Sequence, residues 1–242
     1  MAKLAGEELR DVPYYGLMET NIGGANVVIS QTGFTGEKGY EIYVRDAHEN
    51  AEIVWNAVVE AGEEYGLMVI APAHHRRIAA GILSWGQDLD HETSPFQVNL
   101  SYQVPRNKEA DYIGKAELER QRDVIDKGDF PFKMRMVGLT FGGKEVTDYA
   151  PDFWLIADTD GNDMGYVTSP WWSPELNTNI ALGWVPSTSS EIGTKLQVRL
   201  PDEYSESPGV AAEGEIVDVP FRESVTPNKR EVQKAKGLDY AD

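Results

Sequence analysis

The side chains that most often carry out chemistry in proteins are scarce in this sequence. There is no cysteine among the 242 residues, which excludes disulfides, thiolate metal sites, iron–sulfur clusters and cysteine nucleophiles. The four histidines, His48, His74, His75 and His91, form no HxH or HExxH pattern, so no metal site is predicted. His74 and His75 are consecutive in a predicted helix and face different ways, so at most one of them can point into a site.

A loop with three glycines separates two β-rich runs near the start of the chain. The runs are residues 27–32 and 40–44, and the loop is 33–39. Because side chains alternate along a strand, the apolar residues of the second run share one face, which leaves Glu41 and Tyr43 together on the other. Taken alone, Glu41 is most simply interpreted as a solvated glutamate on a strand.

Helices and strands alternate after this loop. Asp46 is expected to cap a helix that runs to about Tyr65. A short strand over 67–71 then meets Pro72, which suits the first turn of a helix extending to about Trp85. No regular element is predicted between Trp85 and a short helix around 115–122.

The pattern changes to short strands and frequent turns beyond a glycine- and proline-bearing linker at 126–131. The six predicted strands cover 134–141, 153–157, 164–168, 180–185, 195–200 and 215–219. Strands at this spacing indicate a small antiparallel barrel or sandwich.

The charge balance is strongly acidic, with 22 basic against 40 acidic residues and a formal net charge of −18. The acidic residues are spread along the chain, and such a field repels phosphate backbones. We therefore expect no nucleic-acid partner and no membrane partner. No apolar run approaches the roughly 20 residues of a membrane span, and the first residues lack signal-peptide features, so a cytoplasmic location is expected.

Five blocks of sequence, in order, closely resemble the glycine cleavage T-protein (aminomethyltransferase) family. They are 32–42, 81–90, 93–96, 112–115, and 165–169 leading to 173–176. The resemblance runs from about residue 20 to Phe221. It implies tetrahydrofolate-dependent one-carbon transfer, with tetrahydrofolate as the cofactor.

The resemblance assigns cofactor contacts to the glycine loop and the strand after it. Glu41 matches the family's pterin-binding glutamate. A pterin presents two adjacent N–H donors, and an ionised carboxylate accepts both in parallel. Phe34 matches a position where the family places an aromatic ring over the pterin, although simple packing of the loop would also explain it.

The helix after Pro72 departs from the T-protein pattern. Ala73 stands where T-proteins carry an arginine, and the run 72–78 looks more like the folate-dependent demethylase branch, which acts on dimethylsulfoniopropionate, vanillate or syringate. Tyr43 matches a substrate-pocket tyrosine of the sulfonium demethylase, or else is a half-exposed strand residue. Arg77 is a candidate cofactor contact, with a helix-surface arginine paired to an acidic neighbour as the alternative.

Trp171 and Trp172 fall in a predicted barrel loop that the family places close to its interdomain cleft. Trp171 is therefore a candidate substrate contact, and the alternative is that both tryptophans simply plug the loop. The family's catalytic aspartate precedes the matched region, and neither Asp11, Asp46 nor Asp88 stands in its motif. We assign no catalytic residue and expect a separate N-terminal chain or segment to complete the folate site.

These observations predict an α+β fold. A folate-binding α/β portion at 1–130 is followed by a small C-terminal antiparallel β-barrel at 131–226 and a polar tail at 227–242. The expected function is methyl transfer from a small-molecule O-, S- or N-methyl donor to tetrahydrofolate. The alternatives are a true aminomethyltransferase, which releases ammonia and methylene-tetrahydrofolate, and a non-catalytic folate-binding subunit or relative. A relative of the kind that assists iron–sulfur assembly is disfavoured, because its signature cysteine is absent.

Overall fold

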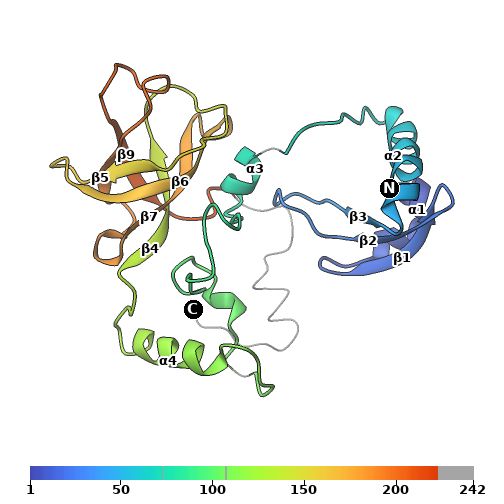
Figure 1. Cartoon of the computed structure of the whole chain (residues 1–242), viewed down its shortest axis with the longest axis horizontal. Helices are drawn as coiled ribbons and strands as arrows, with labels where there is room; N and C mark the ends of the chain where they lie inside the picture. The colour runs from blue at the N-terminus through green and yellow to red at the C-terminus, as the bar shows by residue number, and fades with distance from the viewer. Residues whose placement is uncertain (73, 107, 223–242) are drawn as a thin grey trace. The chain divides into compact units, whose positions relative to one another are not determined.

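The computed structural model describes residues 1–72, 74–106 and 108–222 (Figure 1). These residues form two compact units, which divide between Pro72 and His74 and are described separately. The sequence-based domain boundaries at residues 130 and 226 stay predictions. The polar tail and Ala73 lie outside the described residues.

The first unit is a three-stranded antiparallel sheet with a helix packed on one face. Its elements are α1 (Ala2–Ala5), the 3-10 helix η1 (Glu7–Asp11), β1 (Leu17–Ile22), β2 (Ala25–Ser30), β3 (Glu41–Val44) and α2 (Ala47–Glu63). The strand order is β1-β2-β3. Ile22, Val27 and Ile29 of the sheet and Val54 of α2 share one buried apolar cluster, which fixes the helix against the sheet. Strand β1 was not predicted, because its residues mix polar and apolar types.

The predicted faces of β3 are confirmed. Ile42 and Val44 pack against the apolar cluster, while Glu41 and Tyr43 are exposed. The helix after β3 is also confirmed, and Asp46 stands at its N-cap as predicted, but the side chain does not act as a cap. Asp46 has a left-handed backbone (φ 50°, ψ 52°) and makes no side-chain cap hydrogen bond, because a capping side chain requires an extended backbone at that position.

The predicted strand over 67–71 is wrong for the structure as described. These residues pair with no described strand, and Met68, Val69 and Ile70 are exposed. The run has the composition of a strand, but a strand forms only where a neighbour accepts and donates its backbone hydrogen bonds.

The second unit contains a closed antiparallel barrel of six strands in the order β4-β7-β6-β5-β8-β9 (Figure 1). The strands are β4 (Met134–Phe141), β5 (Trp154–Ala157), β6 (Asp163–Ser173), β7 (Thr178–Pro186), β8 (Lys195–Val198) and β9 (Ala212–Val217). The helical elements are α3 (His74–Ala79), η2 (Ser101–Gln103), α4 (Lys115–Ile125) and η3 (Ser187–Ser189). Inward-facing residues such as Leu139, Ile156 and Ile216 form the barrel core.

All six predicted strands are present, and the α+β fold with a C-terminal barrel is confirmed. Strand β6 is longer than predicted, so Trp171 and Trp172 lie within a strand rather than a loop. The helix predicted to reach Trp85 is shorter and ends at Ala79. Gly81 has φ +66°, and the N–H groups of Gly81 and Ile82 bond back to Ile78 and Arg77. This glycine-dependent arrangement terminates the helix.

Gly165 lies in β6 where two strands approach closely. A Cβ atom at this position would lie 2.0 Å from the Trp184 carbonyl oxygen, so Gly165→Ala should lower the free energy of unfolding by about 1–3 kcal/mol. Gly142→Ala is the matched control in the barrel, because its Cβ would meet only the Glu213 carbonyl oxygen, at 3.9 Å. Guanidinium denaturation of both variants tests this. Equal midpoints would contradict the close approach of β6 to β7 at this position.

The segment between α4 and β4 carries the predicted linker. Residues 126–129 and Pro131 are exposed, and Gly128 has φ +85°. Exposed turns of this kind are preferred sites of proteolysis. Limited trypsin digestion should cut after Lys127, or in the chain beyond Phe221, before any site within β4 to β9. Early cuts inside the barrel strands, identified by mass spectrometry of the fragments, would refute this expectation.

Candidate functional site

The first part of the candidate site is a small polar cluster on the exposed face of β3. Ser30 of β2 pairs with Glu41 of β3, which brings the chain just after β2 beside the glutamate. The Thr32 hydroxyl donates a hydrogen bond to Glu41 Oε2. The Tyr43 hydroxyl donates to the same oxygen at 3.1 Å. The sequence therefore predicted the pairing of Glu41 with Tyr43 correctly, and it missed the contribution of Thr32.

In this cluster the Glu41 side chain acts as a hydrogen-bond acceptor. The hydrogen bond to Glu41, and then the carboxylate charge, raise the pKa of Tyr43, which therefore stays protonated and donating. A carboxylate has about four lone-pair positions. The two donors named above use one oxygen, and within the described residues no side chain or backbone group bonds to Oε1 of Glu41. The group can therefore accept N–H donors from a bound molecule.

Phe34 lies in the glycine loop of the same unit, and 47% of its surface is exposed. The loop turns at Gly36, which has φ +73°, and the Thr35 hydroxyl accepts the Glu37 N–H at 3.2 Å. An exposed aromatic ring on a turn offers a face for stacking a planar ligand. The assignment of Phe34 to the cofactor stays a prediction.

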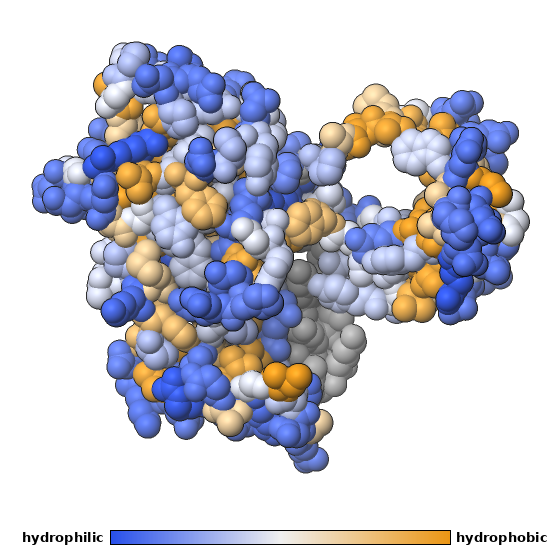
Figure 2. Space-filling model, viewed as in Figure 1, coloured by the Kyte–Doolittle hydropathy of each residue, from blue (hydrophilic) through white to orange (hydrophobic). Residues whose placement is uncertain are grey.

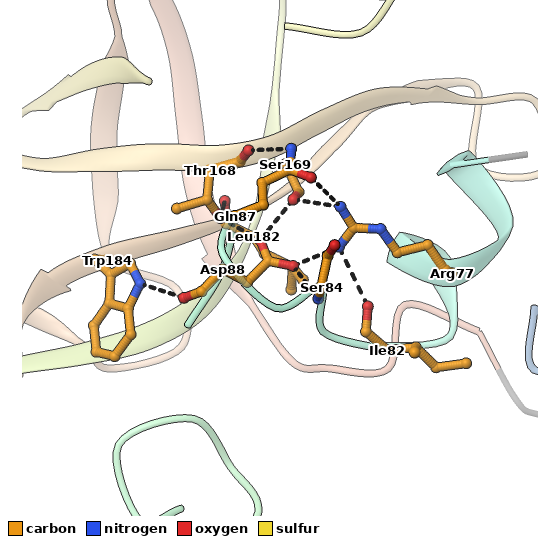
Figure 3. Close-up of polar contacts among 9 residues, drawn as sticks. All are labelled: Arg77, Ile82, Ser84, Gln87, Asp88, Thr168, Ser169, Leu182 and Trp184. Atoms are coloured by element: carbon orange, nitrogen blue, oxygen red, sulfur yellow. Dashed lines mark hydrogen bonds and ion pairs between the residues drawn. The ribbon is translucent and has the colours of Figure 1, made fainter. Parts of the chain in front are cut away.

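Arg77 has a different environment, in the interior of the second unit (Figure 3). It is 1% exposed, and its Nη1 lies 2.5 Å from Asp88 Oδ2. Its Nη2 donates to Ser169 Oγ at 2.7 Å and to Gln87 Oε1 at 3.1 Å. Its Nη1 also donates to the Ile82 carbonyl at 3.3 Å. Protein acceptors thus occupy both terminal nitrogens, while the buried Nε has no partner in the described part of the chain.

Asp88 is the centre of this network, and sequence reasoning did not identify it. Its Oδ1 accepts the hydroxyl protons of Thr168 and Ser169, both at 2.6 Å. Its Oδ2 accepts the Ser84 N–H at 2.7 Å, and its carbonyl accepts the Trp184 indole N–H at 2.9 Å. The network therefore ties the loop after α3 to strands β6 and β7 of the barrel (Figure 3).

This environment bears on both interpretations of Arg77. The pairing with an acidic residue is present, but the pair is buried and not on a helix surface as the alternative supposed. A cofactor contact by Arg77 stays a prediction. The sequence carries no local signal for the pair, because the two residues lie eleven positions apart and helix neighbours are only three or four positions apart.

Trp171 packs in an aromatic group on the second unit. Its ring centroid lies 5.7 Å from that of His74, which in turn lies 5.6 Å from that of Tyr149. Burial, and then the charge of Arg77, lower the pKa of His74, so this ring is neutral at pH 7. The neighbouring His75 contacts none of these rings, as expected for consecutive helix residues. The substrate contact of Trp171 stays a prediction.

The predicted site residues thus fall on two units. Phe34, Glu41 and Tyr43 belong to the first, and Arg77 and Trp171 to the second. Within residues 1–72, 74–106 and 108–222, no group of three or more metal-ligating side chains could hold a metal ion. No helix in the same described ranges is long and apolar enough to cross a membrane.

Comparison with known proteins places this chain in a family. Residues 1–108 match the family model of the GCVT N-terminal domain, and residues 135–221 match that of the glycine cleavage T-protein C-terminal barrel domain. The chain belongs to the glycine cleavage T-protein family. The family match begins at residue 1, earlier than the motifs alone indicated.

Relatives of this T-protein family member carry two kinds of name. The aminomethyltransferase of Saccharopolyspora erythraea is 31% identical, over 91% of this chain and 56% of its own length. The dimethylsulfoniopropionate demethylase DmdA of Ruegeria pomeroyi is 32% identical, over 84% of this chain and 52% of its own length.

A solved structure shares the fold. The crystal structure of the glycine cleavage system aminomethyltransferase T from Bartonella henselae matches with a TM-score of 0.68 and 22% identity, over 90% of this chain and 55% of that one. The present chain therefore spans about half the length of the relatives it matches.

Proposed function

We propose that this chain is part of an enzyme that transfers a methyl group from an O-, S- or N-methyl donor to tetrahydrofolate. The observation that carries the proposal is the Glu41 carboxylate, which Thr32 and Tyr43 hold on the exposed face of β3 with Oε1 open. Membership of the T-protein family, with relatives named as aminomethyltransferases and as a demethylase, supports it.

The residues present on the first unit fit a pterin. Oε1 of Glu41 is open to accept an N–H of the pterin, while Oε2 already accepts the Thr32 and Tyr43 hydroxyls, and the exposed Phe34 ring offers a stacking face. Tetrahydrofolate would supply the nitrogen that accepts the one-carbon group. Arg77 and Trp171 are proposed as a further cofactor contact and a substrate contact from the second unit.

The contribution of these residues to the reaction is positional. The hydroxyl groups of Thr32 and Tyr43 fix the orientation of the Glu41 carboxylate, so this group is oriented for binding before the ligand binds. Holding two reactants in line and in near contact removes much of the entropic barrier to a transfer reaction. In this proposal Tyr43 acts twice, because it orients Glu41 through its hydroxyl and presents its ring toward the methyl donor.

A methyl donor is favoured over an aminomethyl donor on two sequence features. Ala73 replaces the arginine that the T-protein pattern has at this position, and Tyr43 matches the sulfonium demethylase pattern. The alternative, an aminomethyltransferase, is supported by the names of relatives such as those of Saccharopolyspora erythraea and Bacillus subtilis, the latter 32% identical over 78% of this chain and 49% of its own length. A non-catalytic folate-binding subunit is the third possibility.

The test uses an extended chain, made by joining the portion of the Ruegeria pomeroyi demethylase that this chain does not match ahead of residue 1. With tetrahydrofolate and dimethylsulfoniopropionate, vanillate or syringate, the extended chain should form 5-methyltetrahydrofolate with one donor, detected by mass spectrometry. Glu41→Ala should abolish this product, and the 242-residue chain alone should form none. Release of ammonia and methylene-tetrahydrofolate from an aminomethyl-lipoyl protein would instead establish the aminomethyltransferase alternative.

A further inference from the structure

A series of hydrogen-bonding groups leads away from Glu41 along the sheet of the first unit. The Thr32 hydroxyl, which bonds to Glu41 Oε2, also lies 3.2 Å from Ser30 Oγ. The Ser30 hydroxyl in turn donates to the Gly16 carbonyl at 3.2 Å. Hydrophilic residues cover much of the visible surface of the molecule (Figure 2), so a single surface hydroxyl does not mark a site. A connected series that ends on a carboxylate is more specific.

Strand pairing fixes these groups relative to one another. Ser30 is the last residue of β2, and it pairs with Leu17 of β1 on one side and with Glu41 of β3 on the other. The Gln31 N–H donates to the Gly16 carbonyl at 3.0 Å, which ties the chain after β2 to the start of β1. The arrangement therefore follows from the sheet of the first unit alone.

The Thr32 hydroxyl carries one proton and has two acceptors within reach. One acceptor is Glu41 Oε2. The other is Ser30 Oγ, which can accept because the Ser30 proton is already donated to the Gly16 carbonyl. Rotation of the Thr32 hydroxyl therefore moves its proton from Glu41 to Ser30 without leaving the proton unpaired.

The second acceptor matters because Oε2 of Glu41 has no lone pair to spare. A carboxylate oxygen has two lone pairs, and those of Oε2 accept the hydroxyls of Thr32 and Tyr43. Two parallel N–H donors match the two oxygens of a carboxylate, with one donor to each oxygen. A pterin that donates both of its adjacent N–H groups to Glu41 therefore requires one hydroxyl to leave Oε2. Thr32 can leave at little cost, since Ser30 accepts its proton.

We propose that Thr32 and Ser30 form a two-position hydroxyl switch that clears Oε2 of Glu41 when the pterin binds. In the free protein, the Thr32 proton holds the carboxylate in its orientation. In the complex, this proton is donated to Ser30, and Glu41 accepts both N–H groups of the pterin. Thr32 and Ser30 are positioning residues, because they act through Glu41. The inference rests on the proposed function and deepens it, since it states how the site admits a ligand with two adjacent donors.

Isothermal calorimetry of tetrahydrofolate binding to the extended chain tests the switch. Ser30→Ala removes the second acceptor of the Thr32 proton, so the Kd should rise about tenfold, as for the loss of one hydrogen bond. In a Thr32→Val background there is no proton to move, and adding Ser30→Ala should change the Kd less than about twofold. Ser190→Ala is the matched control, because Ser190 is a half-buried serine of the second unit whose hydroxyl also donates to a backbone carbonyl, at 2.9 Å. This control should leave the Kd unchanged.

A second ligand separates the switch from a purely structural role of Ser30. In the 2-desamino-2-methyl analogue of tetrahydrofolate, a methyl group replaces the exocyclic amine, which leaves one N–H for Oε1 of Glu41. Because Oε2 need not be cleared, Ser30→Ala should bind this analogue as tightly as the unmodified protein does. Equal weakening with both ligands would overturn the inference. So would a tenfold effect of Ser30→Ala that persists in the Thr32→Val background.

Glu41→Gln in the same experiment separates this inference from the proposed function. If Glu41→Gln binds tetrahydrofolate as tightly as the unmodified extended chain does, the proposed function is wrong and the switch is wrong with it. If Glu41→Gln weakens binding and Ser30→Ala does not, the proposed function stands and only the switch is overturned.

Discussion

Replacing Asp88 with alanine should lower the free energy of unfolding by about 3–5 kcal/mol. The side chain is fully buried and accepts hydrogen bonds from Arg77, Thr168, Ser169 and the Ser84 backbone. Removing it leaves the Arg77 charge in the interior without its counter-ion, and it takes away the acceptor of the Ser169 hydroxyl and of the Ser84 N–H. The cost is therefore that of an uncompensated buried charge, and not that of a single hydrogen bond.

The matched control is the exposed ion pair between Arg106 and Asp126. Its two hydrogen bonds, both 2.7 Å, have good geometry, but the side chains are 38% and 41% exposed. Solvent screening should make the loss of stability in Asp126→Ala small beside that in Asp88→Ala. Guanidinium denaturation followed by tryptophan fluorescence measures both variants. If Asp88→Ala loses no more stability than Asp126→Ala, the network does not hold the loop after α3 to the barrel.

Most of the fold could be predicted because its signals are local. The six barrel strands are short runs between frequent turns, and each was located to within a few residues. The prediction of a strand at 67–71 was wrong for a non-local reason. A strand must pair with a neighbouring strand, and the described residues provide none for it. The predicted length of the helix after Pro72 was also wrong. The apolar pattern continues to Trp85 and indicated a longer helix, but Gly81 adopts a positive φ and ends the helix early.

The candidate site was predicted only in part. The facing of Glu41 and Tyr43 follows from the two-residue period of a strand, so the sequence was sufficient there. The network around Asp88 joins Arg77 to Ser169, which lies 92 positions later in the chain. No local pattern encodes such a contact. Trp171 was identified as a candidate, but its packing against His74 depends on the extra length of β6.

The second large effect is expected at Glu41. Glu41→Gln keeps the shape of the side chain but replaces one acceptor oxygen with an NH₂ donor, which would face a donor of the pterin. Loss of a charged hydrogen-bond partner and the resulting mismatch should cost about 1.5–3 kcal/mol of tetrahydrofolate affinity, or roughly a 10- to 150-fold weaker Kd. The folded structure should be unaffected, because the side chain is exposed.

Isothermal calorimetry of tetrahydrofolate binding to the extended chain tests this assignment most directly. The unmodified protein and Glu49→Gln, a control on the exposed surface of α2, should bind with the same Kd, and Glu41→Gln should bind roughly 10- to 150-fold more weakly. An unchanged Kd for Glu41→Gln would show that the carboxylate on β3 does not hold the pterin, and the proposed function would lose the observation that carries it.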